Sequence, residues 1–319
     1  MKKLFTKTLL LVCLVFLTYL VLFLLPNKPT LLYASILDKH ALLRRAGSPK
    51  IVFVGGSSLA LGLDSEMIHA KTGLPVVNMG LNGGLGLRYM LEEIKPDIAA
   101  GDLVIISPEY EHWYGSLLDG DLNLWWILQV QPGFSQFISS QIQVETLLKY
   151  LPEFMQEKFL ALLPAKIDPV YNRMAFNQYG DFVNHLTLAA PAHLDGIKQL
   201  KAEPYNGQTF AVLQNFATFA KQRGANTLFI FPPLAKTQFA FKDNQAAIQQ
   251  LYTLVKQLPG ITVLGMPEDF VFPDQMFFDT VYHLRADGRT LRTTRMNDLL
   301  LQVMASRHLL HKPSLASKP

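Results

Sequence analysis

The sequence predicts an α/β protein with a doubly wound, mostly parallel five-stranded sheet, a helical insertion and an N-terminal transmembrane helix. Two observations predict the sheet. Short apolar segments recur along the chain, and the segments between them end in helix-stop residues. A third observation, an unbroken apolar run near the start, predicts the transmembrane helix.

Five short segments are candidate strands. Each is rich in Val, Ile, Leu or Phe and is bounded by Gly, Pro, Asn or Asp, as is typical of buried parallel strands. They are Ile51–Val54, Val76–Asn78, Leu103–Ser107, Thr227–Phe231 and Ile261–Leu264.

The segments between these strands carry helix signals. Helices are expected over Asp64–Lys71 before Gly73, Leu87–Ile94 before Pro96, Thr209–Arg223 before Gly224, Asn244–Gln257 before Pro259 and Ala286–Ala305. Gly and Pro at these places end helices, and Asp64 is expected to be an N-cap. Alternating strands and helices favour right-handed crossovers and one α/β domain, over residues 51–307.

The stretch 116–205 interrupts this rhythm with aromatic residues and prolines, and it is expected to be a helical insertion. Two interpretations stay open, additional cover for the core or a lid or partner surface beside the active edge. Residues 30–50 are expected to form a juxtamembrane helix or linker, and 308–319 a flexible tail.

Residues 1–29 are expected to be a membrane anchor. The apolar run Thr8–Leu25 has 18 residues, which at about 1.5 Å each approach the ~30 Å bilayer core. Lysines precede it, which predicts a single pass through the inner membrane with the domain on the periplasmic side. A cleaved signal peptide is the alternative, but no small-residue cleavage site directly follows Leu25.

Composition excludes several classes of protein. Of the 29 basic residues, Lys2, Lys3, Lys7, Lys312 and Lys318 lie at the ends, which leaves 24 basic against 25 acidic residues. A nearly neutral body argues against nucleic-acid binding. Cys13, inside the apolar run, is the single cysteine, so no disulfide is expected. The eight histidines show no metal-ligand spacing, and no metal site is expected.

Polar residues follow the predicted strands in a consistent order. Gly55-Gly56-Ser57-Ser58 follows the first strand and Asn78-x-x-x-x-Gly83 starts at the end of the second. Glu109-Tyr110-Glu111-His112 follows the third, and Asp279-x-x-x-His283 follows the last. Carboxyl ends of parallel strands are where ligands bind in open α/β sheets. A serine needs an adjacent base to become a nucleophile, and an acid to orient that base.

In these blocks the chain resembles the SGNH (GDSL-like) hydrolases, a superfamily with a flavodoxin-like sheet whose members are mostly esterases, lipases and acyl-group transferases. The resemblance covers about 50–115 and 225–300. The overall layout also resembles a membrane-anchored branch whose members act on acyl groups of envelope polymers. It implies Ser57 as nucleophile, His283 as general base, Asp279 as its orienting acid, and Gly83 as an oxyanion donor. It implies no cofactor.

The third block departs from that family. Where the family carries an oxyanion-binding Asn, the nearest residue here is Glu111, and an ionised carboxylate cannot donate a hydrogen bond. Asn82, Tyr110 and His112 are the other candidate donors. One residue more than usual also separates Asp279 from His283.

The sequence therefore predicts an exported serine esterase or O-acyl transferase that acts on an envelope glycan or polymer, with acetyl as the expected acyl group. An acylated glycan or lipid is the expected substrate, and a membrane-bound O-acyltransferase is an expected partner. Two alternatives stay open. One is a weakly catalytic accessory protein for such a partner. The other is a lysophospholipase or thioesterase whose acyl site uses the aromatic residues Trp113, Trp125, Trp126, Phe134 and Phe137. Arg292 and Arg295 are expected on a solvated or ion-paired helix face.

Overall fold

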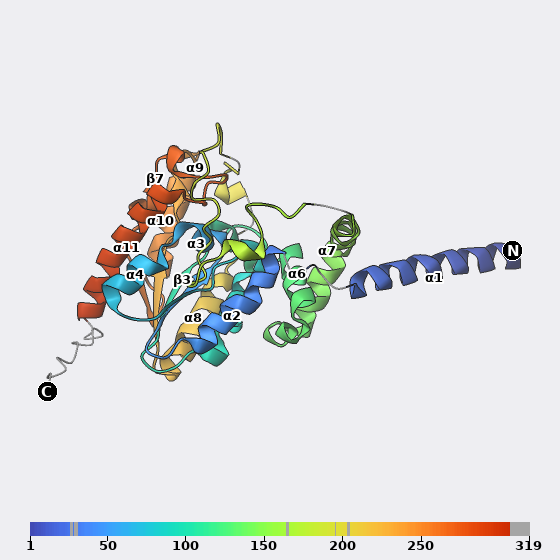
Figure 1. Ribbon diagram of the computed structural model, residues 1–319, viewed down its shortest axis with the longest axis horizontal. Helices are drawn as coiled ribbons and strands as arrows, with labels where there is room; N and C mark the ends of the chain where they lie inside the picture. The colour runs from blue at the N-terminus through green and yellow to red at the C-terminus, as the bar shows by residue number, and fades with distance from the viewer. Residues whose placement is uncertain (26–27, 29–30, 164–165, 195, 203–204, 307–319) are drawn as a thin grey trace.

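The computed structural model describes residues 1–25, 28, 31–163, 166–194, 196–202 and 205–306. It consists of an α/β body from which one long helix projects (Figure 1). The predicted tail 308–319 lies outside the described residues.

Five parallel strands form the central sheet, and they confirm the predicted α/β class. The strands are β1 (Ile51–Gly55), β2 (Val76–Asn78), β3 (Leu103–Ser107), β4 (Asn226–Ile230) and β6 (Ile261–Leu264). Their order is β2-β1-β3-β4-β6, and every neighbouring pair is parallel. A separate parallel pair, β5 (Leu234–Ala235) and β7 (Val271–Phe272), lies outside this sheet.

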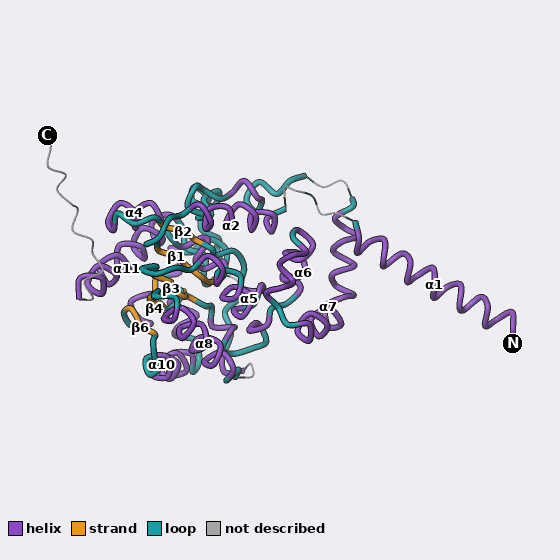
Figure 2. Tube along the Cα trace, turned by 90° about the horizontal axis from the view of Figure 1, so that it is seen from below, coloured by secondary structure: helices purple, strands orange, loops and turns teal. Residues whose placement is uncertain are grey.

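Helices cover both faces of the sheet. Figure 2 shows α4 and α11 on one side of the strands and α5 and α8 on the other. The helices of the body outside the insertion are α2 (Ser35–Arg45), α3 (Ser57–Gly62), α4 (Ser65–Thr72), α5 (Leu87–Glu92), α8 (Gln208–Gln222), α9 (Lys236–Ala240), α10 (Asn244–Val255) and α11 (Ala286–Ser306). The five predicted helices are therefore confirmed to within a few residues at their ends.

The local signals act as predicted at α4. The carboxylate of Asp64 accepts a hydrogen bond from the backbone N–H of Met67 at 3.1 Å, which caps the first turn. Gly73 ends the helix with φ of 70°, a left-handed conformation that glycine adopts without steric cost. Sequence-local chemistry thus determines both ends of this helix.

The core lies on both faces of the sheet, and β1 shows why. All five of its residues are buried, as are those of β3. Each fully buried side chain such as Phe53 contributes about 1.5–3 kcal/mol of hydrophobic free energy. Residues 31–50 belong to this body, because α2 buries Ile36 and Leu43 in the same core.

The insertion is helical only in its first half. It contains α6 (Leu122–Val130) and α7 (Ser140–Ala161), which pack together, whereas the described residues from 166 to 202 form turns and short 3-10 segments. Trp125 and Trp126 on α6 are buried rather than exposed. The first half of the insertion therefore adds its own apolar layer to the core.

The N-terminal helix α1 (Lys2–Leu24) has 23 residues, and its most apolar window has a mean hydropathy of 2.5. It buries none of its residues in the body. By length and composition it is suited to cross a membrane.

Candidate active site

The carboxyl edge of the sheet carries a cavity of about 400 Å³. β1 ends at Gly55, and the chain turns at once into α3, which begins at Ser57. The residues that line the cavity include Ser57, Asn82, Gly83, Glu109, Glu111 and His283. The structure thus brings together, at one place, residues that lie up to 226 positions apart in the sequence.

His283 and Asp279 form a hydrogen-bonded pair. The distance from His283 Nδ1 to Asp279 Oδ1 is 2.7 Å, and an ionised carboxylate can only accept, so Nδ1 carries the hydrogen. The second carboxylate oxygen of Asp279 accepts from the hydroxyl of Tyr171. In the neutral imidazole, a hydrogen on Nδ1 leaves the lone pair of Nε2 free to act as a base.

The electrostatics of Asp279 favour its charged form. Burial by itself raises the pKa of this carboxyl, but the hydrogen bond and charge of His283 and the hydroxyl of Tyr171 outweigh burial. The pKa of Asp279 therefore lies below its ordinary value. A charged Asp279 holds the tautomer of His283 in which Nδ1 is the donor.

The two adjacent serines have different environments. Ser57 lines the cavity, whereas Ser58 is fully buried and its Oγ has no hydrogen-bond partner among the described residues. The backbone N–H of Ser58 donates to Oε1 of Glu109 at 2.9 Å. Only Ser57 of the pair is therefore placed to meet a molecule bound in the cavity.

Gly56 and Gly83 allow two backbone segments to approach closely. A Cβ on Gly56 would lie 2.6 Å from the backbone nitrogen of Gly83 and 2.5 Å from either carboxylate oxygen of Glu109. No side chain larger than hydrogen fits there. Asn82 caps its own turn, because its side-chain oxygen accepts from the N–H of Gly84 at 2.8 Å.

Glu109, rather than Glu111, lies beside these glycines, which corrects the alignment of the third block. The side chain of Glu109 is almost fully buried, and its Oε2 has no hydrogen-bond partner among the described residues. His112 Nδ1 lies 3.7 Å from this oxygen. The ring of His112 instead contacts two backbone oxygens at 3.1 Å, those of Glu109 and Gly83.

Glu111 also lines the cavity, but at another part of its wall. Its carboxylate accepts from the Tyr282 hydroxyl at 2.8 Å and lies 3.4 Å from Lys198 Nζ. Tyr110 is buried, packs against Phe231 and Tyr282, and is not part of the cavity lining. The prediction of Tyr110 as a substrate-binding residue is therefore wrong, because the short helical turn Tyr110–His112 directs its ring into the core.

Arg292 supports the segment that carries Ser57. Its guanidinium is fully buried and donates to the backbone oxygens of Ser58 at 2.7 Å and Gly62 at 3.2 Å. Burial lowers the pKa of Arg292 to about 9, while the charge of Glu109 opposes that effect. The expectation of a solvated or surface ion-paired face is wrong for Arg292, although Arg295, one turn further along, is exposed.

Three of these residues were not predicted to belong to the site, namely Tyr171, Glu109 and Arg292. Tyr171 belongs to the insertion, where no spacing connects it to Asp279. Glu109 was visible as an acid directly after a buried strand, which is a usable signal. Arg292 lies on the same side of α11 as Thr293 and Met296, which are also buried. Their helical spacing is the signal that places Arg292 on the inner face of this helix.

Comparisons with known proteins add no identification. No family model matches the sequence, and no sufficiently similar curated protein was found.

Proposed function

We propose that this protein is a membrane-anchored serine esterase or O-acyl transferase that acts on short acyl esters, such as O-acetyl groups, of an envelope glycan. The observation that carries this proposal is the arrangement of Ser57 and His283 on one cavity, with the base oriented by Asp279 from behind. The strand order is that of flavodoxin-like doubly wound sheets, and it is consistent with membership of the SGNH superfamily.

The proposed reaction uses these groups in two steps. Ser57 Oγ attacks the ester carbonyl carbon while His283 Nε2 accepts the hydroxyl proton. The C–O bond to the leaving alcohol then breaks, and His283 returns the proton to that alcohol. Water, or a hydroxyl of an acceptor glycan, next attacks the acyl carbon of the acyl-serine and gives up its proton to His283. The bond between that carbon and Ser57 Oγ then breaks, and His283 returns the proton to Ser57 Oγ. The nature of this second nucleophile separates an esterase from a transferase.

The developing oxyanion needs donors, and the backbone N–H groups of Ser57 and Gly83 are the candidates. Oxyanion stabilisation by such preorganised donors is a major part of catalysis in acyl transfer. The carboxylate of Glu109 lies close to Gly56 and Gly83. It offers a hydrogen-bond acceptor at the place where SGNH hydrolases carry an asparagine that donates. This feature favours slow or substrate-restricted chemistry over broad hydrolysis.

The residues that line the cavity favour a substrate with short acyl groups over one with long acyl chains. None of the five aromatic residues considered for an acyl-chain site lines the cavity. Trp113, Trp125, Trp126 and Phe134 are buried in the core, and Phe137 is half-buried against it. Glu109, Glu111, Asp121 and Lys198 do line it. Such charged groups suit a hydrated polysaccharide better than a fatty acid. The lysophospholipase alternative therefore loses its support.

A second candidate function is supported by Glu109 alone. If its carboxylate prevents oxyanion binding, the same cavity would hold an acylated polymer without cleaving it, as an accessory protein for a membrane-bound O-acyltransferase. The lysines that precede the apolar run of α1 support a periplasmic location for either function.

Fluorophosphonate labelling of the full chain in membranes tests the proposal. We expect labelling of the wild type, loss of labelling in Ser57→Ala, and a decrease of about 10⁴-fold or more in rate for His283→Ala. Ser58→Ala is the matched control, and it should keep most of the labelling. A folded wild type that is not labelled would favour the accessory function, and labelling abolished only by Ser58→Ala would show that the wrong serine has been chosen.

A further inference from the structure

α7 carries an apolar stripe that the body covers only in its middle, at Met155 and in part at Leu151. The stripe recurs every three or four residues, so its members share one side of the helix. They are Val144, Leu148, Leu151, Met155 and Phe159 of α7, and Leu162 directly after its end. Polar residues repeat in the same way along another side, as Glu145, Lys149, Glu153 and Gln156.

Four members of this stripe are exposed, to 55% at Val144, 71% at Leu148, 55% at Phe159 and 53% at Leu162. Large apolar side chains aligned on one exposed helix face are unusual for a surface that contacts only water. The other side of α7 packs inward through Phe154, so the exposed stripe is not needed to hold the helix in place.

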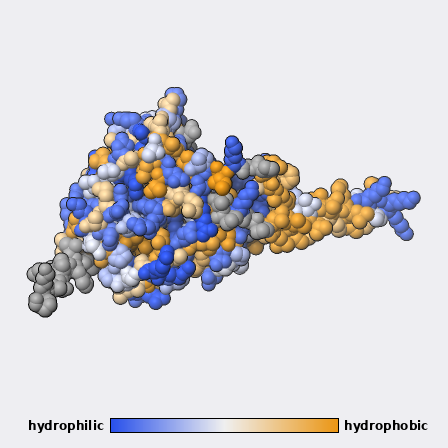
Figure 3. All heavy atoms as spheres, viewed as in Figure 1, coloured by the Kyte–Doolittle hydropathy of each residue, from blue (hydrophilic) through white to orange (hydrophobic). Residues whose placement is uncertain are grey.

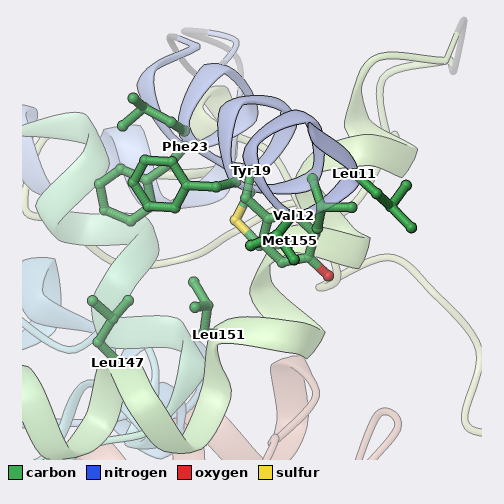
Figure 4. A pocket seen from close by; sticks show the side chains of 10 residues that line it. Leu11, Val12, Tyr19, Phe23, Leu147, Leu151 and Met155 are labelled. Carbon is green, nitrogen blue, oxygen red and sulfur yellow. The ribbon is translucent and has the colours of Figure 1, made fainter. Parts of the chain in front are cut away.

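The stripe continues onto α1. Leu147, Leu151 and Met155 of α7 and seven residues of α1, between Leu11 and Phe23, together line an apolar groove of about 580 Å³ (Figure 4). Figure 3 shows the same continuity, because the apolar surface of α1 extends without interruption onto the adjoining end of the body. The groove therefore connects the exposed face of α7 with a helix suited to cross a membrane.

The carboxyl end of α1 is fixed beside α7. The ring of Phe23 lies 6.1 Å from Trp125 and 6.0 Å from Phe154 between centroids. Lys158 of α7 donates to the backbone oxygen of Leu25 and to Gln129 Oε1. Aromatic and lysine side chains at the end of an apolar span are typical of the membrane–water interface.

The directions of the two helices complete the argument. In Figures 1 and 2, α7 runs across the line of α1 rather than along it. If α1 crosses the bilayer, α7 therefore lies along the membrane surface. An amphipathic helix in that position buries its apolar face about 5–10 Å into the boundary between headgroups and acyl chains.

We propose that α7 is an interfacial membrane helix whose apolar stripe contacts lipid acyl chains, and that such chains fill the groove between α1 and α7. The occupant is the bilayer rather than a second protein because the stripe is continuous with the membrane-length helix and is separated from water-facing surfaces by the polar side of α7. This proposal is independent of the chemistry at Ser57.

Spin-label accessibility in the full chain tests it. In a Cys13→Ala background, the protein is reconstituted into phosphatidylethanolamine/phosphatidylglycerol vesicles with a nitroxide at Leu148→Cys. The matched control carries the nitroxide at Glu153→Cys, on the polar side of the same helix. The measured quantity is the ratio of the label's collision rate with oxygen to its collision rate with a water-soluble nickel chelate. We expect this ratio to be several-fold higher for the label at 148 than for the label at 153.

Two outcomes would overturn the proposal. If both labels collide equally with the nickel chelate, α7 lies in water. If the label at 148 is shielded from oxygen and from the chelate alike, protein rather than lipid covers the stripe. A label at Val144→Cys, on the same stripe, repeats the measurement independently if the first variant is poorly folded.

Discussion

At the scale of single residues, the most consequential position is Glu109. Its Oε1 accepts the N–H of Ser58, while its Oε2 has no hydrogen-bond partner among the described residues. This oxygen lies close to Gly56 and to Gly83, and the N–H of Gly83 is one of the proposed oxyanion donors. A negative charge there opposes the developing charge of a tetrahedral intermediate. If the proposed function holds, Glu109 combines a structural hydrogen bond with a charge that opposes catalysis.

Glu109→Gln separates those two effects. The amide oxygen keeps an acceptor for Ser58, and the amide nitrogen adds a donor in place of a charge. We expect fluorophosphonate labelling of Ser57 to become about 10-fold faster or more, in line with the effect of one oxyanion donor. Glu111→Gln, which changes a carboxylate elsewhere on the cavity wall, is the control. Slower labelling in Glu109→Gln would mean that the carboxylate itself assists the reaction.

Lys39 allows a test of stability against pH. Its ammonium is fully buried and donates to the backbone oxygens of Asn78 at 2.9 Å and Gly180 at 2.6 Å. Burial lowers the pKa of Lys39 to about 7, although the charges of Asp181, Glu93 and Asp38 oppose that effect. Between this pKa and the ordinary lysine value, the unfolded chain binds a proton that the folded chain does not.

Stability should therefore rise with pH in that window. Relative to Lys39→Met, the free energy of unfolding of the wild type should increase by about 2 kcal/mol between pH 7 and pH 9. Chemical unfolding of both proteins at the two pH values measures this difference. If wild type and Lys39→Met differ in free energy of unfolding by the same amount at pH 7 and at pH 9, Lys39 keeps its ordinary pKa in the folded state.

At the scale of elements, the position of the proposed nucleophile depends on a contact between α11 and α3. Arg292 reaches from α11 to backbone oxygens at the start and the end of α3. α3 spans only 6 residues, which is too short to be stable without tertiary contacts. The long C-terminal helix therefore contributes to the site although none of its side chains lines the cavity.

Removing that contact should be costly. Arg292→Met leaves two buried carbonyl groups without their donor, and each costs about 1–3 kcal/mol of unfolding free energy. We expect chemical unfolding to show a free energy of unfolding that is lower by about 3 kcal/mol. We also expect slower fluorophosphonate labelling of Ser57. Arg295→Met, on the exposed side of the same helix, should cost less than about 1 kcal/mol. Equal losses in the two variants would contradict a special role for Arg292.

At the scale of the whole molecule, α1 and the body are separable parts. α1 buries no residue of its own, and its described contacts with the body are confined to the α6–α7 end. The helices α4, α10 and α11 and the strands of the sheet lie away from that contact (Figure 1). The cooperative core therefore belongs to the body.

This separation predicts the outcome of truncation. A chain of residues 31–319 should fold with a melting temperature within about 4 °C of the full chain in the same detergent, a shift that corresponds to roughly 1–2 kcal/mol for a domain of this size. Differential scanning calorimetry of the two chains measures the shift. A truncated chain without a cooperative transition would show that α1 is an integral part of the fold.

Local patterns in the sequence were sufficient for the five strands of the central sheet and for five of the helices, but not for the short elements β5, β7, α3 and α9. Apolar runs such as Ile51–Val54 and stop signals such as Gly73 act within a few residues, so the strands, the helices and the parallel sheet follow from them. The pairing of Asp279 with His283 is also local, since four positions separate them. The unbroken apolar run Thr8–Leu25 likewise predicts a membrane-length helix at the start of the chain.

Tertiary structure decided which of several similar residues face the cavity. Glu109 and Glu111 are two positions apart, and only the turn after β3 places the first beside Gly56 and the second beside Tyr282. Tyr171 reaches Asp279 across 108 positions, and Arg292 reaches Ser58 across 234. The sequence by itself determined the framework because backbone preferences and apolar periodicity are local. The surroundings of the proposed catalytic groups depended on long-range packing, in which side chains distant in sequence compete for the same space.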